Sequence, residues 1–178
     1  MTGQVPLITA TVAFGMGVDK SSVRFVAHWS APQSIGAYSQ ESGRAGRDGS
    51  QAFGRIYYST KDRDSMLIHL NNQKYENNEK KTLLLENCKR MVKYCEGLTC
   101  RHSVLSDYFG DSKPKCVDKC DICIGIGEVR CKLDKLFNGE EDENDIYRNA
   151  NIELCSVIKK KFYKKELIEF VLIFTKHW

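Results

Sequence analysis

The chain has 178 residues, of which 42% are hydrophobic, and a formal net charge of +4. This length allows one domain or one and a half. Lys and Arg nearly balance Asp and Glu throughout: 5 against 3 in residues 1–60, 13 against 11 in residues 61–131, and 9 against 9 in residues 132–178. The balance excludes a uniformly basic surface, so any nucleic-acid site must be a local patch.

Neither a secretory signal nor a membrane span is evident in the sequence. The first residues lack a basic start, and Thr9 and Thr11 interrupt their apolar run. The apolar run at residues 167–174 is far shorter than the roughly 20 residues of a transmembrane helix. We therefore expect an intracellular, soluble protein, in which the eight cysteines indicate metal binding or free thiols before disulfides.

Short apolar runs rich in β-branched and aromatic residues predict buried strands at residues 6–10, 23–29 and 52–59. Between the second and third runs, Ser34 can cap a helix on which Ile35 and Tyr38 lie one turn apart. A strand, a helix and a strand at this spacing suggest a βαβ unit of a parallel sheet.

After Ser59 the sequence changes to helical periodicity, at residues 60–73 and 79–98. The second segment carries an apolar stripe of Leu84, Cys88, Met91, Val92 and Cys95. We expect a small α-rich module here, followed by a polar, acidic linker at residues 138–151. The basic cluster at residues 159–165, "KKKFYKK", could touch nucleic acid, although a solvated helix face is the favoured interpretation.

Four cysteines, Cys100, Cys116, Cys120 and Cys123, follow the spacing C-x15-C-x3-C-x2-C. The last two are close enough to grip one ion, Cys116 lies one turn back, and Cys100 begins a predicted short helix. Four thiolates suit a closed, tetrahedral structural zinc site. The alternative is four free buried thiols, which the spacing and the compartment disfavour.

The other cysteines and a neighbouring histidine are left out of this metal set. Cys88 and Cys95 lie on the apolar stripe and are interpreted as core residues. Cys131 is near the cluster, but Cys123 already completes a set of four, and His102 is interpreted as a neighbour. In the short helix predicted at residues 100–110, the side chains expected to pack inward are Val104, Leu105, Tyr108 and Phe109.

The stretch "QESGRAGRDG", residues 40–49, places Arg44 and Arg47 three residues apart between glycines. Because Arg is rarely buried unless paired, neither is expected in a core. If residues 40–46 are helical, Gln40, Arg44 and Arg47 project to one side, and such a fork suits phosphate oxygens. The alternative is a helix C-terminus with arginines near its dipole and Gly46 as cap, which explains only one arginine and one glycine.

Together with "ATVAFGMGVDK" at residues 10–20, this stretch resembles motifs V and VI of superfamily two helicases, in their RecQ form. The cysteine set, with "CRHSVLSDYFGD" in front, resembles the zinc-binding module of RecQ proteins. The resemblance covers about residues 3–125. It implies an α/β fold: a partial RecA-like helicase C-terminal lobe with a parallel sheet (1–60), then a small α-helical zinc-binding module (61–131). Residues 132–178 are taken as a linker and tail of unknown structure.

The resemblance implies roles for the residues of motif VI. Arg47, the second arginine of the motif, would be the arginine finger on the γ-phosphate of ATP. Arg44 and Gln40 would support the nucleotide phosphates and couple the two helicase lobes.

It also implies roles for the residues around motif V. Asp19 would face the ribose or the interlobe cleft, with Gly17 as a second nucleotide contact. Thr11 and the backbone around Gly15 would touch the DNA strand or relay the nucleotide state to it. Glycines suit such a loop because the backbone can approach a phosphate or sugar closely.

The chain departs from the family pattern in two respects. Ser39 stands where RecQ proteins usually show a second aromatic residue, which would loosen the helix packing. The sequence also holds no Walker A pattern and no Asp-Glu box for magnesium. We therefore expect the chain to supply the arginine finger but not the nucleotide pocket, and its sheet to keep an exposed apolar edge.

The resemblance implies part of an ATP-dependent 3′-to-5′ DNA helicase that acts in DNA repair, recombination and replication in the nucleus. Its partners would be ATP and DNA, both single-stranded and branched duplex. Zn2+ would be structural, whereas ATP and Mg2+ would bind together with an N-terminal lobe. The 178 residues alone are expected to be inactive, and the alternative is a non-catalytic DNA- or partner-binding module stabilised by zinc.

Overall fold

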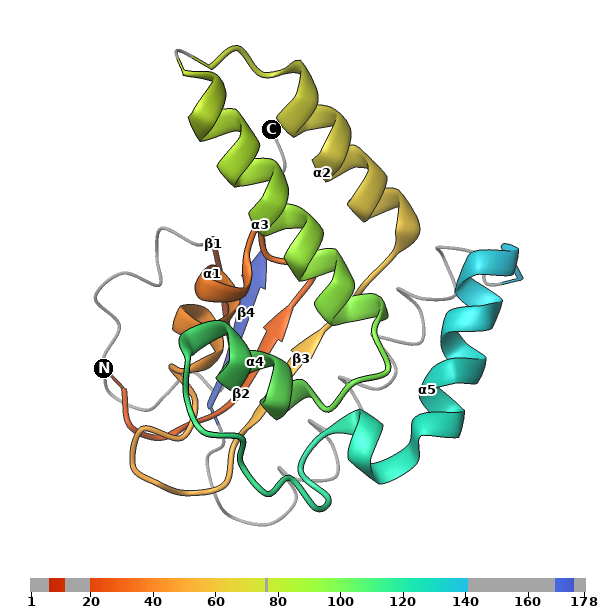
Figure 1. The fold of residues 1–178 in the computed structure, drawn as a ribbon. Coiled ribbons are helices and arrows are strands. Elements are labelled where there is room, and N and C mark those ends of the chain that lie inside the picture. Colours follow the sequence, from red (N-terminus) through yellow and green to blue (C-terminus); the bar gives the residue numbers. More distant parts are fainter. Residues whose placement is uncertain (1–6, 12–19, 76, 141–168, 175–178) are drawn as a thin grey trace.

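The computed structural model describes residues 7–11, 20–75, 77–140 and 169–174. Within these ranges a parallel sheet lies beside a set of helices (Figure 1). The strands are β1 (Leu7–Thr11), β2 (Val23–His28), β3 (Phe53–Ile56) and β4 (Glu169–Phe174). Their order in the sheet is β1-β4-β2-β3, and every pair is parallel. The predicted α/β fold with a parallel sheet is confirmed.

Strand β2 is well buried, with Val26 and Ala27 fully buried. A strand covered on both faces needs a continuous apolar run, which residues 25–27 supply, while Arg24 before them is only partly buried. On one side β2 pairs with β3, where Phe25 faces Phe53. On the other side it pairs with β4.

Strand β4 comes from the segment that the sequence analysis assigned to a tail of unknown structure. It lies between β1 and β2 and pairs with both, so that Val171 faces Ile8 on one side and Val26 on the other. The sheet therefore joins segments from the two ends of the chain. Among the described strands β1 pairs with β4 alone and so stands at one edge of the sheet.

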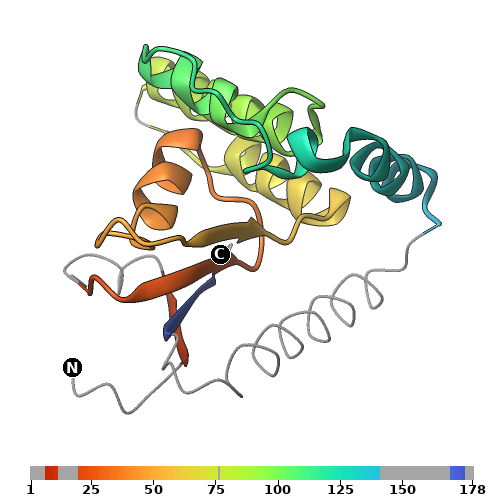
Figure 2. The ribbon, with the colours of Figure 1, turned by 90° about the horizontal axis from the view of Figure 1, so that it is seen from below.

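Helix α1 (Ile35–Ser42) begins at the predicted cap, where the Ala37 amide donates to Ser34 Oγ at 3.1 Å. It ends at Gly43, earlier than the expected helix through residue 46. Ile35 and Tyr38 are both buried, which confirms that they share one face. Figure 2 shows α1 between the sheet and the layer formed by α3 and α4.

Helices α2 (Thr60–Asn72) and α3 (Asn78–Glu96) form an antiparallel pair. Ser59 and Asn77 cap them by accepting hydrogen bonds from backbone amides. Two apolar clusters fix α3: one joins it to α2 through Met66, Leu70 and Cys88, and the other joins it to α1 through Ile35, Tyr38, Met91 and Tyr94. The apolar stripe predicted on α3 is thus confirmed as core.

The module continues with α4 (Arg101–Phe109) and α5 (Asp121–Asn138). Val104 and Leu105 pack against the core as expected, but Tyr108 and Phe109 are exposed, so the expectation for those two was wrong. Helix α5 runs to Asn138, past residue 131, where the module was expected to end. Helix α5 contributes little to the core, because Ile122 is its one buried residue.

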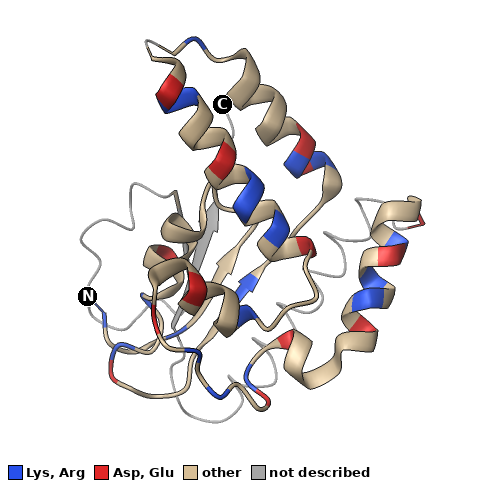
Figure 3. Ribbon diagram, viewed as in Figure 1, with Lys and Arg blue, Asp and Glu red and all other residues tan. Residues whose placement is uncertain are grey.

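Charges of both signs occur along α2, α3 and α5 (Figure 3). No helix within the described ranges has both the length and the hydropathy that crossing a membrane requires. The basic cluster at residues 159–165 lies outside the described residues. The described surface therefore shows the balanced charge that the sequence predicts.

Candidate functional site: an arginine loop and a cysteine cluster

The arginines lie in a tight loop that follows α1, over residues 43–50. Gly43 ends the helix, and the Gly46 amide donates to the Val23 carbonyl at the start of β2 at 2.9 Å. Gly46 has φ +74°, and a Cβ there would lie 3.0 Å from both Ala52 Cβ and Ser50 O. Glycine is therefore required at this position, both for its left-handed backbone and for the space.

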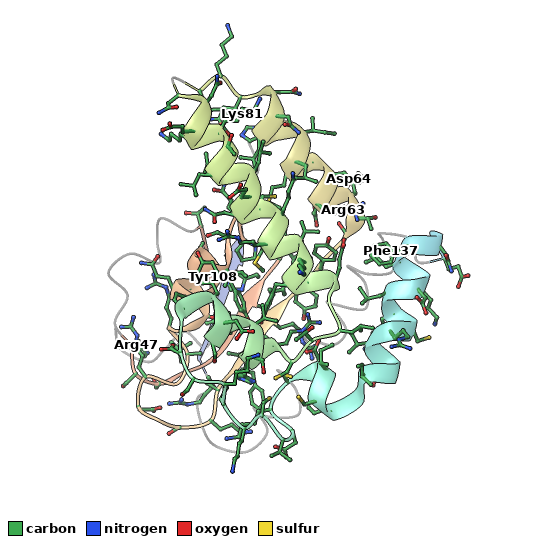
Figure 4. The ribbon with its side chains drawn as sticks, in the orientation of Figure 1. Arg47, Arg63, Asp64, Lys81, Tyr108 and Phe137 are labelled. Carbon is green, nitrogen blue, oxygen red and sulfur yellow. The ribbon has the colours of Figure 1, made fainter. Side chains whose placement is uncertain are left out.

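The three predicted side chains do not share one face. Gln40 and Arg47 are exposed, whereas Arg44 is 8% exposed. Figure 4 shows Arg47 at the outer side of the loop. The expected common face was wrong because the helix ends two residues before Arg44. The expectation that neither arginine is buried was also wrong, since Arg44 is buried, with Nε lacking a hydrogen-bond partner in the described part of the chain.

A buried pair of polar side chains, His28 and Glu41, holds α1 against the sheet. His28 Nε2 and Glu41 Oε2 are 2.8 Å apart, and both side chains are almost fully buried. The pair joins the last residue of β2 to the residue after Gln40. Sequence reasoning missed this pair. The available signal was a histidine in a predicted buried strand and a glutamate on the predicted helix, because a buried polar side chain requires a hydrogen-bond partner.

Asp48 fixes the far side of the loop. Its carboxylate accepts a hydrogen bond from the Ser50 amide at 3.0 Å and pairs with the Arg24 guanidinium. The Ser50 hydrogen bond and then the Arg24 contact lower the pKa of Asp48. The residues on both sides of Arg47, Gly46 and Asp48, are thus bonded to β2.

The residues assigned to motif V are mostly beyond the described ranges. Gly15, Gly17 and Asp19 lie outside the described residues. Thr11, the last residue of β1, is described and exposed. Thr11 therefore lies at the carboxyl end of a parallel strand, and ligands commonly bind at this edge of such sheets.

The four predicted cysteines come together between α4 and α5. Cys100 precedes α4, and Cys120 precedes α5, so each stands at a helix N-terminus. Their Sγ atoms are 3.9 Å apart. The ligand atoms of Cys100, Cys116 and Cys120 lie within 4.8 Å of one another, together with His102, which the sequence analysis left out. Cys123 is exposed and does not belong to that 4.8 Å group, although its thiol interacts with those of Cys120, Cys100 and Cys116.

The interactions among the thiols shift their pKa values in different directions. Desolvation acts to raise the pKa of Cys100, but hydrogen bonds from Ser103 and the neighbouring thiols outweigh it and lower the pKa to about 6. The contacts with Cys120 and Cys100 raise the pKa of Cys123 to about 12. Desolvation also raises the pKa of Cys116. Thiols this close cannot all ionise without a cation among them.

The cluster fits a zinc ion. Two sulfurs that each lie about 2.3 Å from a tetrahedral zinc are about 3.8 Å apart. The 3.9 Å between Cys100 and Cys120 Sγ matches this value. A zinc ion bound here would link the start of α4 to the start of α5, and so supply a cross-link in a module with few buried residues.

Arg101 connects the cysteine cluster to the rest of the fold. Its guanidinium donates to Asp121 at 3.0 Å and to the carbonyls of Tyr94 and Gly97 at the end of α3. The Tyr94 ring in turn packs against Tyr38 of α1, with ring centroids 5.4 Å apart. The cluster and helix α1, which leads into the arginine loop, are therefore parts of one packed unit.

Two family models match the chain in sequence. The RecQ zinc-binding model matches residues 61–124, which contain all four predicted cysteines. The model of the helicase conserved C-terminal domain matches residues 1–49, which contain both arginines. The chain belongs to the RecQ family.

Known relatives agree with this assignment. The ATP-dependent DNA helicase Q5 of Rattus norvegicus is 46% identical over 76% of this chain, and the ATP-dependent DNA helicase RecQ of Pasteurella multocida is 37% identical over 81%. The ATP-dependent helicase SGS1 of Saccharomyces cerevisiae is 40% identical over 71%. The match covers 15% of the rat protein, 22% of the bacterial one and 9% of the yeast one.

The residues of the motifs also predict a particular branch of the RecQ family. The cysteine spacing, the "CRH" at residues 100–102 and the "VRFVAHW" at residues 23–29 are most similar to the fifth animal RecQ helicase. The Q5 helicases of rat and mouse, each 46% identical, agree with that prediction.

Proposed function

We propose that this chain is part of an ATP-dependent DNA helicase of RecQ type that moves 3′ to 5′ and acts in DNA repair, recombination and replication in the nucleus. The observation that carries the proposal is the arginine loop, with its buried anchor, in one packed unit with a zinc-type cysteine cluster. The names of the relatives support DNA and ATP as ligands.

In this proposal Arg47 is the arginine finger. It is exposed on a loop that three contacts hold in shape: the Gly46 amide on Val23, Asp48 with Arg24, and Glu41 with His28. An exposed guanidinium on a fixed loop can enter a nucleotide site that another lobe provides, with little entropy lost. Arg44, buried behind it, would orient the loop, and Gln40 would contact the phosphates.

The zinc ion in this proposal is structural and is held by Cys100, Cys116, Cys120 and Cys123. Their convergence at the starts of two helices supports that role. Asp19 and Gly17 would contact the nucleotide, which binds with Mg2+, and Thr11 and Gly15 would contact DNA. Only Thr11 of these four is described, and its exposure at a strand end is compatible with that contact.

A chimeric helicase tests the proposal. The chain replaces the matching segment of the rat Q5 helicase, to which it is 46% identical. We expect the chimera to hydrolyse ATP when DNA is present and to unwind a duplex with a 3′ single-stranded tail but not one with a 5′ tail. A chimera that folds and binds zinc, yet shows no DNA-dependent ATP hydrolysis, would contradict the proposal.

The missing Walker A pattern favours a second candidate for the 178 residues taken alone: a non-catalytic module that binds DNA or a protein partner. We expect the purified chain to show no DNA-stimulated phosphate release. Its DNA binding should be weak and should fall steeply with salt, because phosphate contacts release counterions. DNA-stimulated ATP hydrolysis that copurifies with the chain would reveal a nucleotide site that the sequence analysis missed.

A further inference from the structure

Five donor groups, rather than four, converge at the cysteine cluster. The ligand atoms of Cys100, His102, Cys116 and Cys120 lie within 4.8 Å of one another. Cys123, in the first turn of α5, supplies a fifth donor: its thiol interacts with those of Cys100, Cys116 and Cys120, although its sulfur lies outside that 4.8 Å group. A structural zinc ion takes four ligands, so one of the five donors must stay outside its coordination sphere.

The distance between His102 and Cys116 is too short for both to be ligands of one zinc ion. His102 Nδ1 lies 2.9 Å from Cys116 Sγ. A nitrogen at about 2.05 Å and a sulfur at about 2.3 Å from one tetrahedral zinc would be about 3.5 Å apart. The His102–Cys116 distance is therefore that of a hydrogen bond and not that of two ligands. A shift of roughly 0.6 Å would bring the nitrogen to a ligand position.

Burial distinguishes the two donors that compete for the fourth place. Cys123 is exposed, and Gly125, two residues later, interrupts the helix with φ −162°. His102 is half-buried on the first turn of α4, directly after Cys100 and Arg101, and Arg101 is anchored to α3. The thiol of Cys123 is thus the more accessible to oxidation, which destroys a thiolate ligand, while His102 is held close to the metal position.

We propose that His102 is a reserve ligand of the zinc site. It donates a hydrogen bond to Cys116 while the four cysteines hold the ion, and it binds the ion itself when the sulfur of Cys123 is lost. Both roles use the same nitrogen, so they exclude each other. The inference rests on the proposed zinc site and names a fifth donor for it.

Zinc content of the purified 178-residue chain and its variants tests the inference. We expect about one zinc per chain in the wild type and in Cys123→Ser, and almost none in the double variant His102→Ala/Cys123→Ser. His102→Ala alone keeps four thiolates and should lower zinc affinity about 10- to 100-fold, as lost partners of metal ligands commonly do. Cys120→Ser is the control that loses zinc, and Cys131→Ser, an exposed cysteine outside the cluster, is the control that keeps it.

Cobalt substitution identifies the ligand directly. In Cys123→Ser, replacing a sulfur ligand by nitrogen should move the visible Co2+ bands to shorter wavelength, and the double variant should lose that spectrum. Zinc loss from Cys123→Ser as complete as from the double variant would overturn the inference. So would a double variant that keeps its zinc. A wild-type chain that binds no zinc would instead contradict the underlying zinc site.

Discussion

Single residues decide how the arginines are presented. Gly46 and Gly49 both have a left-handed backbone, with φ +74° and +78°. Their surroundings differ, because a Cβ at Gly46 would meet Ala52 and Ser50 at 3.0 Å, whereas at Gly49 it would meet nothing within 4 Å. Substituting these two glycines therefore distinguishes the cost of backbone strain, which both share, from the cost of crowding, which only Gly46 has.

We predict that Gly46→Ala costs more stability than Gly49→Ala. The left-handed backbone alone costs an alanine about 1–2 kcal/mol. Gly46→Ala adds the displacement of Ser50 and Ala52, so its cost should exceed that of Gly49→Ala by at least about 1 kcal/mol. Urea unfolding of the zinc-loaded chain measures both. Equal costs would mean that the loop does not pack against residues 50–52 as described.

At the scale of elements, the parts that the sequence predicted correctly are those with local signals. Ser34 and the spacing of Ile35 and Tyr38 predicted the start and inner face of α1. The stripe on α3 was correct because it follows the helical period. The end of α1 was missed, because a glycine inside an otherwise helical pattern ends some helices and is tolerated in others.

Strand β4 could not be predicted from local signals. An apolar run such as residues 167–174 has no period that identifies its partners. Its place between β1 and β2 depends on pairing between residues far apart in the sequence, such as Val26 and Val171. His102 was interpreted as a neighbour of the metal ligands, but its hydrogen bond with Cys116 could not be predicted, for a related reason. Its contact with Cys116 arises from the fold of a loop, and adjacency to Cys100 in sequence gave no sign of it.

The place of β4 can be tested with a proline. Leu172 pairs with Thr9 on one side and Ala27 on the other. Leu172→Pro removes a backbone donor from an inner strand and should lower the free energy of unfolding by at least about 2 kcal/mol. Leu172→Val keeps the donor and should cost much less. Equal stability of the two variants in urea would place residues 169–174 outside the sheet.

At the scale of the whole molecule, the arginine loop and the cysteine cluster belong to one packed unit. Tyr38 and Tyr94 join α1 to α3, and Arg101 joins α3 to the cluster. Lys and Arg are interspersed with Asp and Glu along the described helices (Figure 3). In the proposed function Arg47 therefore acts as a specific group at a nucleotide, and not through general electrostatic attraction.

ATP turnover of the chimeric helicase with Arg47→Ala is the most direct test of that claim. We predict that DNA-stimulated turnover falls about 10³-fold or more, the scale on which arginine fingers act. ATP affinity and zinc content should change little, since Arg47 is exposed and distant in sequence from the cysteine cluster. Arg47→Lys, which keeps the charge but loses the planar fork, should recover only a small part. Turnover of Arg47→Ala close to that of the unmodified chimera would contradict the account.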